Sequence, residues 1–140
     1  MFRAVIATLR KAFGDAEPPV WPASSAKLLL LRESVAIEKR AAAIERLSLE
    51  SDAESKALVL AYASDAECHP WLQQCAGEAV ADMIRNNRLN AEEVTSLTEG
   101  AGETAVDILT GRDAATFADQ ISLLKLATRR KVGSSSSDDR

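Results

Sequence analysis

The sequence predicts an all-α protein, built as a short stack of antiparallel helical hairpins or as an irregular helical bundle. Aromatic residues make up only 4% of the 140 residues, with 6 Gly and 4 Pro. Sandwiches and barrels need aromatic and β-branched strands separated by frequent turns, so this composition disfavours them. Along most of the chain apolar side chains recur three and four residues apart, which is the period of an amphipathic helix. Short connections place consecutive helices side by side, mostly antiparallel.

Residues 1–13 are predicted to form an amphipathic arm with Arg3, Arg10 and Lys11 off its apolar side. One helical stripe collects the apolar residues Phe2, Val5, Ile6, Leu9 and Phe13. Residues 14–23 follow as a Pro-rich linker, because a glycine and three prolines interrupt any helix there. Such an arm could lie on a membrane surface, pack back on the domain or cover the core.

A single helical domain is predicted over residues 24–131, followed by a flexible tail at 132–140. Its first helix is expected to be long, capped at Ser24 or Ser25 and ending near Leu49. The next helix opens with the capping-box spacing of Ser51 and Glu54. It is expected to end near residue 64.

The clearest amphipathic helix begins at Pro70 and ends at residues 86–89. Its apolar stripe is Leu72, Cys75, Ala76, Ala79, Val80, Met83 and Ile84. Asn90 and Glu93 have the spacing to cap a further short helix over residues 91–97, with glycines 100 and 102 bracketing its end. Another helix covers residues 105–109 and stops at Gly111, and Asp113 caps the last one. That last helix points Phe117, Ile121, Leu124 and Ala127 inward.

The sequence of residues 76–84 is repeated in part at residues 101–109, an offset of 25, with four of nine positions identical. Two alanine-rich amphipathic helices can share this much by chance. If the repeat is real, it indicates stacked helical hairpins, each unable to bury its own apolar face alone.

Residues 58–65 and 71–84 together resemble a HEAT-type helical repeat. They are similar to small bacterial HEAT-like proteins whose second helix has the pattern small-Glu-Ala-apolar-Ala-acid-apolar-apolar, and residues 88–97 continue the likeness. The resemblance covers about residues 50–111. It implies a short solenoid that binds other proteins rather than a catalyst, and several small families of this kind are immunity proteins encoded beside toxins.

The formal net charge of −4 conceals an uneven distribution. Between Glu50 and Asp107 lie twelve acids and three bases, whereas the first thirteen residues contain only bases. Such a field repels nucleic acid and favours a basic protein partner. The alternative is an acidic surface that serves solubility alone.

The predicted partner-binding residues are acids off the apolar stripes, together with one aromatic residue at a helix start. Trp71 follows Pro70 beside acidic residues and would anchor an interface; alternatively, it closes the core between two helices. The complete set is Asp65, Glu67, Trp71, Glu78, Asp82, Glu92 and Glu93.

No enzyme, cofactor or metal function is expected. The sequence holds one His and lacks a phosphate-binding Gly loop or a nucleophile-elbow motif. Cys68, His69 and Cys75 match no closed zinc pattern. The acid pairs Glu78/Asp82 and Glu99/Glu103 are interpreted as a solvated helix face.

The sequence has two cysteines and no recognisable signal peptide, which favours location in the reducing cytoplasm.

These observations predict a non-enzymatic helical protein-binding module, most concretely an immunity protein that neutralises a basic toxin through an acidic face. One alternative is a structural or adaptor protein without an inhibitory role. Another is a membrane-peripheral protein anchored by the N-terminal arm, although no apolar run approaches the roughly 20 residues of a membrane span. The sequence carries no indication of oligomeric state.

Overall fold

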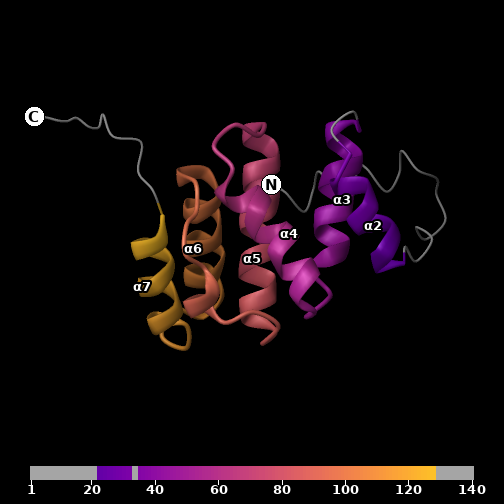
Figure 1. The fold of residues 1–140 in the computed structure, drawn as a ribbon. Helices are drawn as coiled ribbons and strands as arrows, with labels where there is room; N and C mark the ends of the chain where they lie inside the picture. Colours follow the sequence, from indigo (N-terminus) through magenta and orange to yellow (C-terminus); the bar gives the residue numbers. More distant parts are fainter. Residues whose placement is uncertain (1–21, 33–34, 129–140) are drawn as a thin grey trace, which may run out of the picture.

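The all-α prediction is confirmed. The computed structural model describes residues 22–32 and 35–128, and these residues form helices with no strand beyond an isolated bridge between Leu97 and Thr128 (Figure 1). The arm, all of the linker but its last two residues, and the tail lie outside the described residues. The elements are α2 (Ala23–Leu30), α3 (Ile37–Leu47), α4 (Ala53–Ser64), α5 (Pro70–Arg85), the 3-10 helix η1 (Ala91–Glu93), α6 (Glu99–Asp113) and α7 (Ala118–Ala127).

The helices stack in two layers, and contacts between them fix the directions. The Tyr62 hydroxyl at the end of α4 donates to the carbonyl of Leu30 at the end of α2 (2.8 Å), while Lys27 reaches Asp52 at the start of α4 (2.8 Å). Hence α2 and α4 run in the same direction in one layer. In the other layer α5 packs between α3 and α6. The pairs α2–α3 and α4–α5 are therefore stacked hairpins, as Figure 1 shows.

The third unit of the stack replaces its first helix by an extended segment, residues 94–98. Thr98 N–H donates to the carbonyl of Ala63 (2.9 Å) and Leu97 N–H to that of Ala127 (3.0 Å), so the segment lies between α4 and α7. The predicted helix over residues 91–97 is therefore wrong, although its capping box at Asn90 forms. β-Branched Val94 and Thr95 favour extended backbone, and carbonyls of neighbouring elements accept the amides that a helix would have paired.

The single helix predicted from residue 24 to Leu49 is also wrong, because the chain breaks between α2 and α3. A single helix over residues 24–49 would be about 39 Å long. It would extend beyond the neighbouring helices, because the 16 residues of α5 span only about 24 Å. Folding α2 back buries Ala26 and Leu30 in the shared core. No serine caps α2, since Pro22 occupies its N-cap.

Other helix ends also differ from the sequence prediction. Asp52, rather than Ser51, caps α4 by accepting from Ser55 N–H (3.1 Å). Thr98 caps α6, and this one helix contains all three glycines that were expected to end helices. Asp113 is the last residue of α6; its carboxylate accepts from Thr116 N–H (3.2 Å), and Phe117 occupies the N-cap of α7.

The core prediction for α5 is confirmed, since every residue of its predicted apolar stripe is buried. Gly77 explains how α6 approaches so closely: a Cβ there would lie 2.9 Å from the Cα of Ala101. At the matching position of the sequence repeat, Gly102 has the side chain of Thr128, not backbone, as its close neighbour.

Stability is expected to fall in acid, partly through Asp52. The Lys27 ammonium, the Ser55 hydroxyl and the Ser55 N–H all favour the charged carboxylate and lower the pKa of Asp52 below its usual 3.8. This contribution is therefore fully present above 3.8 and is lost as the pH falls below that value. Asp52→Asn keeps an N-cap acceptor but removes the titration, so its melting temperature should drop less than that of the wild type between pH 7 and the acid range. An equal drop, followed by circular dichroism, would contradict this origin.

Candidate functional site

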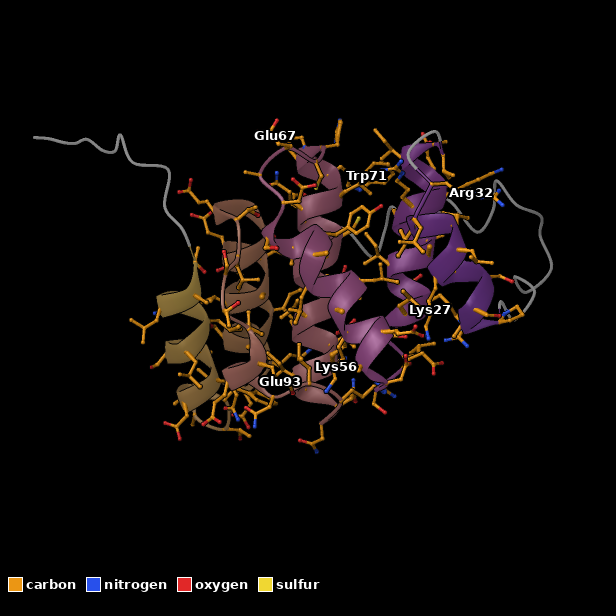
Figure 2. All side chains as sticks on the ribbon, in the orientation of Figure 1. Lys27, Arg32, Lys56, Glu67, Trp71 and Glu93 are labelled. Carbon is orange, nitrogen blue, oxygen red and sulfur yellow. The ribbon has the colours of Figure 1, made fainter. Side chains whose placement is uncertain are left out.

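The predicted partner-binding residues do not form one face. Asp65 and Glu67 lie in the loop before α5, whereas Glu92 and Glu93 lie on η1, after its end. Because α5 separates them, the two groups stand about 24 Å apart along the axis of that helix. Figure 2 shows Glu67 and Trp71 toward one end of the molecule and Glu93 with Lys56 toward the other.

Glu78 was predicted to be a solvated acid, and the structure contradicts this, because its side chain is buried with 5% exposure. The middle of α5 is enclosed by α3, α4 and α6, so all residues from Cys75 to Ala81 are buried, not only those of one stripe. Glu78 therefore cannot contact a partner. Asp82 is half-buried and pairs with Arg85 of the same helix (3.1 Å).

The acids of η1 serve the fold. Glu93 accepts from the Asn90 N–H (3.0 Å) and pairs with Lys56 of α4 (2.9 Å), and these interactions lower the pKa of Glu93. Glu92 remains exposed. A partner that used Glu93 would have to compete with two existing interactions.

Trp71 packs against the core and is partly buried, with its indole nitrogen also buried. This arrangement favours the alternative in which Trp71 closes the core between helices. An exposed aromatic anchor would instead present its ring to solvent.

The Cys68, His69 and Cys75 group does not gather around a common point. Nδ1 of His69 accepts from Trp71 N–H (3.1 Å) and so caps α5. Burial raises the pKa of Cys68 to about 11, and burial near the carboxylates of Glu78 and Glu45 raises the pKa of Cys75 further. Both thiols therefore stay protonated at neutral pH. In the described ranges no three His, Cys, Asp or Glu side chains gather around a point where a metal ion could sit.

An open cavity of about 130 Å³ lies between α6 and α7 and is here called the α6–α7 groove. One wall carries three carboxylates on successive helical turns, and Lys125 stands on the α7 side. Its lining residues are Glu99, Gly102, Glu103, Val106, Asp107, Lys125 and Thr128. The groove is therefore rimmed by acids over a small apolar floor.

Local chemistry explains how the α6–α7 groove forms. Thr98 caps α6, and Glu99 follows in its first turn, where negative charge is favoured by the helix dipole; Glu103 lies one turn further on. Gly102 brings the end of α7 close, since a Cβ at this position would lie 2.8 Å from that of Thr128. The Thr128 hydroxyl donates to the Leu124 carbonyl (2.7 Å), which fixes the last turn of α7 against α6.

The loop that carries Asp65 and Glu67 adjoins the start of α6. Nε2 of Gln73 donates to the carbonyls of Asp65 (3.3 Å) and Cys68 (3.0 Å), while its Oε1 lies beside Gly100. Within the described part of the chain, no basic side chain pairs with either loop acid or with the three groove carboxylates. The negative potential therefore extends from the loop to the α6–α7 groove.

Comparison with protein-family models, with curated proteins and with solved structures finds no match for this chain. None of the helices in the described ranges combines the length and the apolar character that a membrane span requires. The likeness to HEAT-type proteins accordingly stays a prediction, and function is argued from the α6–α7 groove.

Proposed function

We propose that this chain is a non-enzymatic helical protein-binding module whose α6–α7 groove receives a basic segment of a partner protein. The observation that carries the proposal is the row of three carboxylates at residues 99, 103 and 107 above an apolar floor. A lysine or arginine side chain fits both parts, because its aliphatic stem packs on Val106 while its charged head meets carboxylates. The volume suits a side chain better than a small-molecule substrate, whose pockets measure roughly 300–1,000 Å³.

The surrounding charge would also speed encounter with such a partner. Asp65 and Glu67 extend the negative field beyond the α6–α7 groove, and fields of this kind raise association rates in a salt-dependent way. Lys125 on the opposite side would repel a uniformly cationic ligand there. The preferred segment is therefore one in which a basic side chain is flanked by a neutral or acidic one.

The most specific form of the proposal is an immunity protein that neutralises a cationic toxin by covering its basic active surface. Inhibition of this kind needs no chemistry, only complementary charge and fast association. Co-expression with the product of a neighbouring toxin-like gene tests this form: rescue of growth would support it, and a bound partner without rescue would reduce the proposal to protein binding alone.

Reversing two charges of the α6–α7 groove tests the binding proposal. Glu103→Lys combined with Asp107→Lys should weaken binding of a fluorescein-labelled peptide, in which each arginine is flanked by glycine and glutamate, by about tenfold or more, which corresponds to about 1.4 kcal/mol. Both side chains are exposed, so the helix content should not change. Fluorescence anisotropy and circular dichroism measure the two quantities.

The matched control is Glu38→Lys with Glu92→Lys, which changes the net charge equally on α3 and η1. It should reduce affinity by only about twofold, because charges outside the α6–α7 groove act through the screened general field. If both double variants lost the same affinity, the peptide would be binding to the general negative field and not to the α6–α7 groove; if neither lost affinity, the acidic surface would serve solubility alone.

A further inference from the structure

The outer face of α2 is apolar although it ends the stack. Figure 1 shows α2 and α7 at opposite ends of the row of helices. The inner side of α2 buries Ala26 and Leu30, yet Leu28 and Leu31 on the outside are 60% and 67% exposed. A helix that is apolar on both sides is normally covered on both, and terminal units of helical stacks have polar outer faces. As described, α2 is thus an internal helix without its outer neighbour.

We propose that the chain's own residues 2–13 dock as a helix on this face, over Leu28 and Leu31. The segment supplies the complementary surface, a stripe formed by Phe2, Val5, Ile6, Leu9 and Phe13. With that stripe on α2, the basic residues of the segment point to solvent, which gives the stack the polar end it needs. Residues 2–13 are then the terminal helix of the fold.

The connection is long enough for this arrangement. Nine residues, 14–22, join Phe13 to the start of α2, and they can span up to about 30 Å. The eight residues of α2 extend only about 12 Å. Every part of the outer face is within reach, and the covalent connection gives residues 2–13 a high effective concentration compared with any separate molecule.

The test uses the full chain with a nitroxide label on Ser24→Cys, an exposed position of α2. The native thiols compete poorly for the label, because burial raises the pKa of Cys68 and Cys75. The label should attenuate the amide NMR signals of residues 2–13, and adding Leu28→Ser with Leu31→Ser should restore them. A label on Leu126→Cys, at the other end of the stack and 84% exposed, is the matched control and should leave these signals intact.

Three results would overturn the proposal. Signals of residues 2–13 that neither label affects would show that the segment does not dock on α2. Attenuation that persists in the double serine variant would place the contact elsewhere. Attenuation in a mixture of labelled protein and isotope-enriched unlabelled protein would identify a second copy as the occupant. A further measurement would support the proposal: with anionic vesicles added to the labelled protein and then removed, attenuation of the signals of residues 2–13 only after removal would show docking on α2 in the free protein.

Discussion

Gly77→Ala is expected to destabilise the protein by at least about 2 kcal/mol, because the added methyl group meets backbone rather than a side chain that can rotate away. Its Cβ would lie 2.9 Å from the Cα and 3.0 Å from the carbonyl carbon of Ala101, in addition to the carbonyl oxygen. The helices α5 and α6 would have to separate along their whole contact. The higher helix propensity of alanine, about 1 kcal/mol, offsets only part of this cost.

Gly111→Ala is the matched control, since the same substitution in α6 meets nothing within 4 Å. It should stabilise the protein by up to about 1 kcal/mol. Gly102→Ala should fall between the two, because its obstacle is the side chain of Thr128. Urea denaturation measures all three, and equal effects at Gly77 and Gly111 would contradict the close packing of α5 on α6.

Val80→Asp is expected to cost about 3–5 kcal/mol, since it places a carboxylate where the wild-type side chain has no exposure and removes apolar packing. A domain of this size has a free energy of unfolding of about 5–15 kcal/mol, so the variant should lose a large part of its stability and melt well below the wild type. Gln74→Asp, at an exposed position of the same helix, should change stability by less than about 0.5 kcal/mol. A melting temperature of Val80→Asp equal to that of the wild type would show that the stripe on α5 is not core.

The sequence predicts α5 well because each local feature agrees with its packing. Pro70 occupies the first turn, the apolar stripe is unbroken, and the chain leaves the helix at Asn86 and Asn87, the latter with φ of 61°. The break between α2 and α3 could not be predicted in this way. No glycine or proline marks it, and what requires it is the length of the neighbouring helices.

Prediction of the site failed for similar reasons. Amphipathic periodicity treats a helix as having one buried side, whereas α5 is enclosed by three others, and this buries Glu78. The Glu99/Glu103 pair was interpreted as a solvated helix face and its continuation to Asp107 was missed, because Gly100 and Gly102 were interpreted as the end of a helix. In the structure Gly102 instead marks where α7 closes on α6.

The central claim, that a basic side chain of a partner occupies the α6–α7 groove, is tested most directly by an NMR titration of the full chain with the peptide in which each arginine is flanked by glycine and glutamate. The largest amide shift changes are predicted at Gly102, Val106, Asp107 and Thr128, and they should diminish as salt is raised. Changes centred on Glu92 and Glu93, or spread evenly over all acidic residues, would contradict the claim.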